Sequence, residues 1–153
     1  MAINIRTKGA TGEREVISIL ETVLFRVLDK MGCPAEERVK WHKVFQRNQN
    51  QSAVGGNDLC NTFDLSIEVK RQEQLSVNTW WRQCTAAATK AGETPVLIYR
   101  QNRKPWRVVT YVWMPLPDGG HATARAEIDI DTFKVWFEHW VHRKILAGWK
   151  PQS

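Results

Sequence analysis

The segment that most limits the fold is "PVLIYR", residues 95 to 100, an apolar run of strand length in the middle of the chain. A strand with one wet face alternates apolar and polar residues, so an unbroken run predicts a strand that is covered on both faces. Such cover requires helices on each side of the sheet. The segment therefore predicts an α/β fold with a central sheet sandwiched by helices.

Helical periodicity of apolar residues marks three segments of the chain. They are residues 12 to 31, 77 to 91 and about 131 to 147. Gly32 and Gly92 can end the first two helices, because glycine readily adopts the left-handed backbone that follows many helices. Ser76 and Asp131 are expected to cap the second and third helices. The aromatic face of the third helix is interpreted as core packing, with a subunit interface as the alternative.

Stretches with strand character lie between these helices. They are "KVFQR" (43 to 47), "DLC" (58 to 60), "FDLSIEV" (63 to 69), "PVLIYR" (95 to 100) and "WRVVTYVWM" (106 to 114), followed by a further hairpin strand. The second and third stretches are predicted to be two strands joined around Asn61-Thr62, or one interrupted strand. Strands that partly alternate with helices and partly follow one another indicate a mixed sheet.

The length and composition suit an ordinary globular protein. With 153 residues, one domain is the simplest organisation, and no apolar run approaches the length of about 18 residues that marks a transmembrane helix. The N-terminal stretch is polar and lacks the apolar core of a signal peptide. The three cysteines lie far apart, which fits neither a disulfide framework nor a metal knuckle. We therefore expect a cytoplasmic location.

The positive charge of the chain is concentrated in its middle. The net charge is +6, and residues 33 to 110 carry twelve basic and seven acidic side chains. A concentrated basic excess favours a polyanionic partner, because lysine and arginine displace the counterions that condense around phosphates. Nucleic acid is the first such partner to consider, although ordinary solvated charge is the alternative for any single residue.

Glu68 and Lys70 stand two residues apart at the end of a predicted strand, so they point to the same side. Asp58 would reach Glu68 if the chain turns near Asn61-Thr62. Two acids can hold Mg²⁺ for phosphodiester hydrolysis, and a lysine beside them can stabilise the negative charge that develops on the phosphate. Asp64 is a weaker candidate, because an extended strand places it about 13 Å from Glu68. A solvated surface ion pair between Glu68 and Lys70 is the alternative.

The pattern Asp58-x9-Glu68-x-Lys70 resembles the core motif of the PD-(D/E)XK nucleases, and "RTKGATGEREV" (6 to 16) resembles the opening of the archaeal-type Holliday junction resolvases in that superfamily. Further similar segments follow in order along the chain. They are "SAVGGND" (52 to 58), "IEVK" (67 to 70), "WWRQCTAAATKAGETPVLIYR" (80 to 100) and "WRVV" (106 to 109). The resemblance implies a restriction-endonuclease-like α/β core with a central mixed sheet flanked by helices. An extra C-terminal helix would follow this core.

The resemblance also implies roles for individual side chains. The catalytic set that it implies comprises Glu13, Asp58, Glu68, Lys70 and Gln83. The three acids would bind Mg²⁺, with Mn²⁺ as a substitute, while Lys70 assists catalysis and Gln83 supports Lys70. An ordinary helix glutamine is the alternative for Gln83. For the acids of Glu-Arg-Glu (13 to 15), the alternative is that they lie in the first turn of a helix, where the helix dipole favours negative charge.

A set of basic and polar side chains is expected to contact DNA. Its members are Lys8, Arg14, Arg47, Ser52, Arg71, Arg82, Arg103, Lys104 and Arg107. Arg47 and the members in the N-terminal motif and in the loop over 52 to 58 belong to the set through the resemblance. The others could follow a phosphate backbone, and "RQNRKPWR" (100 to 107) is the densest basic stretch.

The acids, Lys70 and the basic charge predict a Mg²⁺-dependent endodeoxyribonuclease. The resemblance implies that it resolves four-way (Holliday) junctions and does so as a symmetric homodimer. The chain would be one nuclease domain over residues 1 to 153, with a core of about 6 to 114 and an appendage of about 115 to 153. Other endonucleases of the superfamily, of restriction, repair or replication type, stay open. So do a non-catalytic DNA-binding module and an accessory protein that needs a partner. A phage-encoded member would act in the host cytoplasm.

Overall fold

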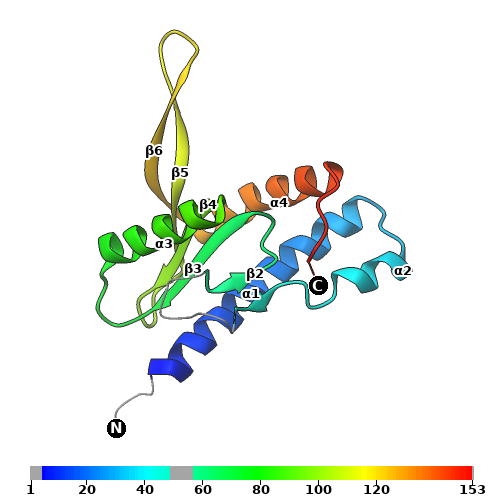
Figure 1. Cartoon of the computed structure of the whole chain (residues 1–153), viewed down its shortest axis with the longest axis horizontal. Helices are drawn as coiled ribbons and strands as arrows, with labels where there is room; N and C mark the ends of the chain where they lie inside the picture. Colours follow the sequence, from blue (N-terminus) through cyan, green and yellow to red (C-terminus); the bar gives the residue numbers. More distant parts are fainter. Residues whose placement is uncertain (1–4, 49–56, 153) are drawn as a thin grey trace.

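The computed structural model describes residues 5–48 and 57–152, with side chains from residue 9 onward (Figure 1). Its elements are α1 (Ile5–Lys30), α2 (Ala35–Arg38), the 3-10 helix η1 (Val39–Trp41), β1 (Gln46–Arg47), β2 (Leu59–Cys60), β3 (Leu65–Arg71), α3 (Val77–Ala91), β4 (Thr94–Arg100), β5 (Arg107–Pro115), β6 (His121–Asp129) and α4 (Ile130–Leu146). None of the helices within the described segments is long and apolar enough to cross a membrane.

The main sheet lies between helical layers. Its strand order is β3-β4-β5-β6, in which β3 and β4 are parallel and the other neighbours are antiparallel. Helix α3 packs on one face, and α1 and α4 pack on the other (Figure 1). The short strands β1 and β2 pair separately. The predicted α/β class, with a mixed sheet between helices and a C-terminal helix, is confirmed.

The apolar run that predicted a doubly covered strand forms β4. Val96 and Ile98 enter the large core cluster against α1 and α4, whereas Leu97 and Tyr99 pack against α3. All four side chains are at most 6% exposed. Because successive side chains of a strand point to opposite faces, burial on both sides removes the polar alternation from the sequence.

Helix α1 begins at Ile5, so the predicted start at residue 12 is wrong. Gly12 lies within the helix because α1 passes so close to β3 that a Cβ on Gly12 would lie 3.3 Å from the Cβ of Arg71. Tertiary packing therefore overrides the weak helix propensity of glycine. The acids of Glu-Arg-Glu lie in the body of the helix and not in its first turn. Gly32 follows the helix with a φ of 68°, as predicted.

Alanine at Gly9 and at Gly12 is expected to change stability in opposite directions. A Cβ on Gly9 meets no atom within 4 Å, so Gly9→Ala should stabilise α1 by roughly 0.5–1 kcal/mol. The same methyl at Gly12 would press on the Cβ of Arg71, which is fixed to the backbone of β3. We expect Gly12→Ala to lower the free energy of unfolding by about 1 kcal/mol, measured by chemical denaturation. An equal gain in both variants would contradict the close contact between α1 and β3.

The chain between β2 and β3 makes a tight turn. Asn61, Phe63 and Asp64 adopt positive φ angles of 59°, 56° and 65°. The backbone N–H of Leu65 donates to the carbonyl oxygen of Thr62 at 3.0 Å. The stretch therefore forms two strands joined by a turn, and the alternative of one interrupted strand is wrong.

The first predicted strand is shorter than expected. Only Gln46–Arg47 of residues 43 to 47 pairs as a strand. Val44 and Phe45 are consecutive and both buried in the core, so this part of the chain lacks the alternation of a strand. Helix α3 has the predicted bounds and ends at Gly92. Among the described residues, Ser76 holds the predicted N-cap position without a side-chain capping bond.

Helix α4 completes the core from the C-terminal side. Its N-cap is Asp129 and not Asp131, because the Oδ1 atom of Asp129 accepts a hydrogen bond from the backbone N–H of Thr132 at 2.6 Å. Phe133 and Phe137 are fully buried in the same cluster as α1 and β3. These two rings are therefore core packing, as predicted, whereas Trp136 and Trp140 of the same helix are only partly buried.

Candidate active site

Asp58 lies along the edge of β3. Its backbone N–H donates to the carbonyl oxygen of Ile67 at 3.0 Å, and its Oδ2 atom accepts a hydrogen bond from the backbone N–H of Val69 at 2.6 Å. These two bonds flank Glu68 and hold the buried Asp58 carboxylate beside it. The turn between β2 and β3 thus produces the approach that the spacing predicts.

Glu68 and Lys70 share the face of β3 opposite to Ile67 and Val69, which pack in the cluster with α1. The Nζ atom of Lys70 lies 3.6 Å from the Oε1 atom of Glu68, and the two side chains are 24% and 12% exposed. Glu68 and Lys70 therefore form an ion pair, as the alternative to a catalytic role expects. However, it is largely buried and lies next to a second acid, whereas a surface pair would be solvated.

The carboxylates of this cluster disfavour one another's charge. Burial, and then the negative charge of Glu68, raises the pKa of Asp58 to about 7 despite its hydrogen bond from Val69. Burial also raises the pKa of Glu68, although Lys70 lowers it, and the charge of Glu13 raises both values. The cluster therefore has an excess of negative charge that a bound cation would relieve.

Glu13 reaches this region from α1. Its side chain is buried and forms an ion pair with the Nε atom of Arg47 on β1, which is 35% exposed. Across residues 5–48 and 57–152, no three His, Cys, Asp or Glu side chains are grouped so that they could hold a metal ion. The role of Glu13 as a metal ligand stays a prediction, because this structure pairs Glu13 with an arginine.

Asp58 and Glu68 provide ligands that suit a hard divalent cation. Mg²⁺ prefers oxygen ligands and is often bound through only one or two carboxylates, with water and substrate oxygens at its other positions. The two carboxylates offer such oxygens, and burial followed by the charge of neighbouring acids raises the pKa of Asp58, while burial raises that of Glu68. The donor set therefore fits Mg²⁺ or Mn²⁺.

Divalent cations are expected to stabilise the folded chain through these two acids. At a Mg²⁺ or Mn²⁺ concentration tenfold above the dissociation constant, a site present only in the folded state adds about 1.4 kcal/mol. This corresponds to a rise in Tm of roughly 3–6 °C relative to EDTA for a chain of this size. Differential scanning fluorimetry should show the rise in the wild type and in Asp64→Asn, but not in Asp58→Asn or Glu68→Gln. An equal rise in all four proteins would place the cation elsewhere.

Cys84 is a neighbour of the site that sequence reasoning missed. From α3, its Sγ atom donates to the carbonyl oxygen of Ser66 at 3.7 Å, and burial followed by the charge of Glu68 raises the pKa of Cys84 to about 12. The thiol therefore stays neutral beside the acids. The helical periodicity that buries Trp80, Cys84 and Ala88 was the available signal. The predicted Gln83 is exposed on the same helix, and its support of Lys70 stays a prediction.

Asn57 is a second residue that sequence reasoning did not assign to the site. Its Oδ1 atom accepts a hydrogen bond from Ser66 Oγ at 2.8 Å, and its Nδ2 atom donates to Glu93 Oε1 at 2.8 Å. These bonds tie the residue before Asp58 to β3 and to the start of β4. The position directly before Asp58 was the only signal in the sequence.

Two of the predicted DNA-binding arginines, Arg71 and Arg107, form ion pairs within the protein, as does the neighbouring Arg100. Arg71 and Arg100 both pair with Glu15, at 2.7 and 3.1 Å, and Arg107 pairs with Glu127 at 3.3 Å. Arg71 and Arg100 are only 24% and 21% exposed. They join α1 to the ends of β3 and β4, so a structural role accounts for them.

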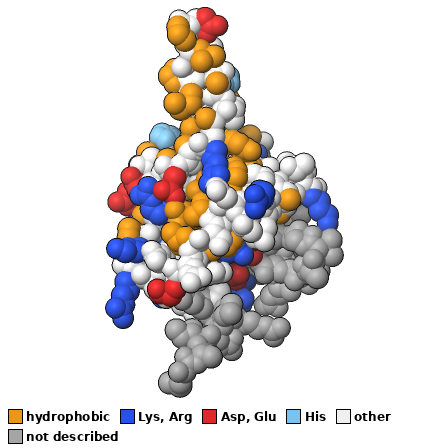
Figure 2. Space-filling view, turned by 90° about the vertical axis from the view of Figure 1, so that its left-hand side faces the viewer, with side chains coloured by type: hydrophobic (Ala, Val, Ile, Leu, Met, Phe, Trp, Pro, Cys, Tyr) orange, Lys and Arg blue, Asp and Glu red, His pale blue; other side chains and the backbone are white. Residues whose placement is uncertain are grey.

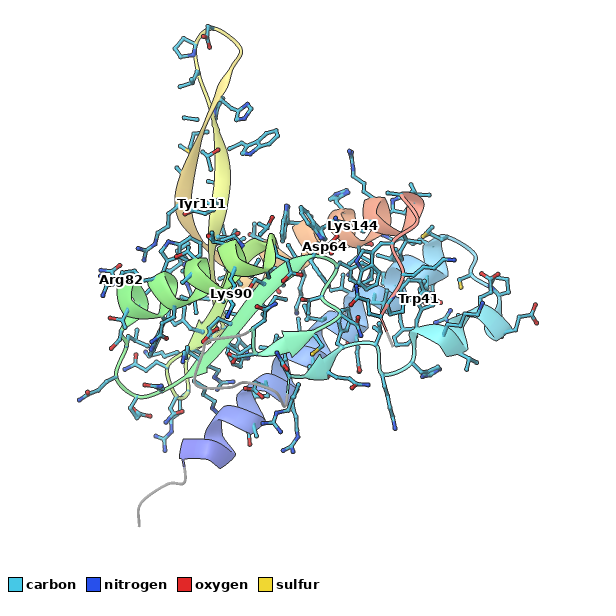
Figure 3. The ribbon with its side chains drawn as sticks, viewed as in Figure 1. Trp41, Asp64, Arg82, Lys90, Tyr111 and Lys144 are labelled. Carbon is cyan, nitrogen blue, oxygen red and sulfur yellow. The ribbon has the colours of Figure 1, made fainter. Side chains whose placement is uncertain are left out.

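The other predicted DNA-binding residues differ in their surroundings. The exposed ones are Arg14, Arg82, Arg103 and Lys104. Arg82 lies on α3, the helix that also carries Lys90 (Figure 3). Arg47 is the ion-pair partner of Glu13. Ser52 and the side chain of Lys8 lie outside the described residues.

Asp64 lies at the other end of β3 from the candidate site. Its Oδ2 atom is 2.6 Å from the Nζ atom of Lys144 on α4, and Figure 3 shows the two side by side. The weaker rank of Asp64 as a site residue agrees with this position. Asp64 therefore provides a matched control for variants of Asp58.

One comparison with known proteins identifies a family. The sequence profile of a family described as "Phage putative PDDEXK endonuclease" matches residues 4–143. Among solved structures, the chain is similar to Hjc of Archaeoglobus fulgidus, described as a Holliday junction resolvase from an archaeal hyperthermophile. That match has a TM-score of 0.37 and 18% sequence identity, and it covers 84% of this chain and 88% of that chain. Comparison with curated protein sequences finds no match.

Proposed function

The chain belongs to the phage PDDEXK endonuclease family, and from this premise we propose that it is a Mg²⁺-dependent endodeoxyribonuclease that resolves four-way DNA junctions. The observation that carries the chemical part of the proposal is the position of Asp58. Its carboxylate accepts a 2.6 Å hydrogen bond from Val69 and so lies beside Glu68, on the strand that also carries Lys70. These three residues form the Asp58-x9-Glu68-x-Lys70 pattern, and their position at one edge of the sheet supports the proposal.

Each residue of the cluster has a distinct proposed role. Asp58 and Glu68 would hold the metal, and Glu13 completes the acidic set while Arg47 balances its charge. A bound Mg²⁺ polarises the scissile phosphate and lowers the pKa of the attacking water. Lys70, next to Glu68, orients that water and stabilises the negative charge that develops on the phosphate.

A basic turn near the cluster supports DNA as the substrate. Strands β3 and β4 are parallel, and Lys70 is level with Tyr99 in their register. The turn that follows β4 therefore leaves the sheet at the same end as Lys70, and it carries the exposed Arg103 and Lys104. We propose that these two side chains contact the DNA backbone on either side of the scissile phosphate.

The preference for junctions rests on the N-terminal motif over residues 6 to 16 and on the proposal that the chain is a homodimer. A symmetric dimer presents two equivalent sites, which suits paired nicks in opposing strands of a branched molecule. Glu13 belongs to this motif, and its charge acts on Asp58 and Glu68, so the motif adjoins the cluster of acids. Arg14 of the same motif is exposed and available to DNA.

Cleavage of four DNA substrates tests the proposal. We expect a four-way junction to be cut at least about tenfold faster than duplex, flap or single-stranded DNA, with Mg²⁺ and at one fixed salt concentration. The salt must be fixed because non-specific phosphate binding depends steeply on it. Glu68→Gln serves as the inactive control on every substrate.

Two results would replace the proposal by one of its alternatives. Equal cleavage of all four substrates would indicate a general endonuclease of the family. Binding of DNA without cleavage, with either Mg²⁺ or Mn²⁺, would indicate a binding module that keeps the scaffold.

A further inference from the structure

A two-stranded arm projects from the body of the molecule (Figure 1). Residues 107–110 of β5 pair with both β4 and β6, in a register that ends at Val96↔Thr110 on the β4 side. From Tyr111↔Arg125 to Pro115↔His121, β5 and β6 continue as a ribbon. We call residues 111–125 the arm. Isolated two-stranded ribbons are only marginally stable in water, so an arm of this length gains from a partner.

The arm exposes apolar side chains and is poor in positive charge. Tyr111, Trp113, Met114 and Leu116 are 45%, 72%, 51% and 44% exposed. The sequence has no lysine or arginine from residue 108 to 124, and its one acid there is Asp118. On the face shown in Figure 2, hydrophobic side chains cover the arm, an acidic group lies at its tip, and basic side chains begin at its base.

A hollow of about 720 Å³ lies at the base of the arm. Its walls include Tyr111, Val112 and Trp113 of the arm, and Trp136 and Trp140 of α4. The lining is mostly apolar, and Glu93 is the one acidic or basic residue among the described residues that form it. The volume is within the range of protein ligand sites, and it suffices for several large side chains.

The charges of the two surfaces exclude a polyanion as the partner. DNA binding requires lysine or arginine, whereas the charged residues of the arm tip and the hollow are the acids Asp118 and Glu93. The one arginine of the arm, Arg125, lies at its base, where it donates to Asn78 and lies over the ring of Trp81. Both surfaces are instead apolar and aromatic. An apolar projection and an apolar hollow on the same chain are complementary to each other, which is the requirement for a two-fold contact between identical chains.

We propose that a second copy of this chain occupies the hollow, with the arm tip of each subunit inserted at the base of the other's arm. Tyr111 to Pro115 extend the ribbon by about 14 Å, which gives the tip the reach to cross to a neighbour. The contact would bury Trp113, Met114 and Leu116. This inference deepens the proposed homodimer and rests on that part of the proposed function.

Sedimentation of arm variants tests the contact. The wild type is expected to be a dimer at about 10 μM, and the triple variant Trp113→Ser, Met114→Ser, Leu116→Ser should raise the dimer dissociation constant by at least about 30-fold. Val135→Ser is the matched control, because Val135 is 59% exposed on α4 and is not part of the hollow or the arm. Circular dichroism and a thermal melt establish that each variant is folded.

A mixed crosslinking experiment keeps the proposal testable even if the triple variant unfolds. Leu116→Cys at the arm tip and Thr132→Cys at the hollow are placed on separate chains that carry tags of different size. Oxidation of the mixture should give a disulfide-linked species containing one chain of each kind. The wild-type mixture measures the background from Cys33, Cys60 and Cys84.

Three outcomes would overturn the proposal. They are a wild type that stays monomeric at about 100 μM, a dimer unaffected by the triple variant, and a triple variant that stays dimeric but loses DNA binding. The last outcome would assign the arm to DNA. Activity separates this proposal from the nuclease assignment. A cleaving monomer refutes the arm contact and the homodimer but leaves the nuclease assignment, whereas an arm-linked dimer that cuts no DNA refutes the nuclease assignment alone.

Discussion

Asp58→Asn and Glu68→Gln are each expected to reduce DNA cleavage by about a thousandfold or more. Both changes keep the shape of the side chain and remove one anionic oxygen ligand from the pair that Val69 holds together. A metal contributes several kcal/mol of charge stabilisation to phosphodiester hydrolysis, and each 1.36 kcal/mol corresponds to a factor of ten in rate. Single-turnover cleavage at saturating Mg²⁺ measures the loss.

DNA binding should survive in the same variants. The proposed phosphate contacts come from exposed basic side chains outside the acidic pair, and removal of one negative charge should strengthen binding slightly. Asp64→Asn is the matched control, because Asp64 pairs with Lys144 at the other end of β3. It should cleave at the wild-type rate. Wild-type cleavage by both Asp58→Asn and Glu68→Gln would remove these acids from the mechanism.

Phe63→Ala is expected to lower the free energy of unfolding by about 3–5 kcal/mol. Phe63 is fully buried, and its ring lies 4.0 Å from that of Trp149 and 5.9 Å from that of Phe45, measured between centroids. It also has a φ of 56°, which is strained for a bulky side chain. Burial of the ring therefore maintains the turn, and its loss leaves both a cavity and an unsupported backbone.

Urea denaturation of Phe63→Ala and Val135→Ala measures this effect against a surface control. Val135→Ala should change the free energy of unfolding by less than about 0.5 kcal/mol, because Val135 is 59% exposed. The turn at Phe63 also places Asp58 beside Glu68, so the same variant should lose metal-induced stabilisation where it remains folded. A loss below about 1 kcal/mol would show that the turn does not depend on this ring.

The helices and the central strands followed from local periodicity. Residues 77 to 91 and 95 to 100 were predicted nearly to the residue, because burial of a regular face leaves a repeating pattern in the sequence. The start of α1 was not predicted. The predicted helix began at residue 12 and so left out residues 5 to 11, and the close approach of α1 to Arg71 explains why a glycine stands at position 12.

Part of the candidate site was also readable from the sequence. Asp58, Glu68 and Lys70 are close enough in the chain that a strand, a turn and a second strand determine their proximity. Cys84 and Asn57 were missed, because their contacts with the motif strand come from packing and carry no spacing rule. The pairing of Glu13 with Arg47 joins residues 34 positions apart, on elements whose relative position the sequence does not specify.

The sequence by itself determined the α/β class and the helices and strands near the motif. It also determined that Asp58, Glu68 and Lys70 lie close together. These depend on interactions between residues close in the chain, which leave periodic patterns. Tertiary structure alone decided which charges are paired, that Arg71 and Arg100 are engaged by Glu15, and that β5 and β6 extend beyond the sheet as an apolar arm. Those properties depend on the distances between elements, and a linear pattern of residue types does not record them.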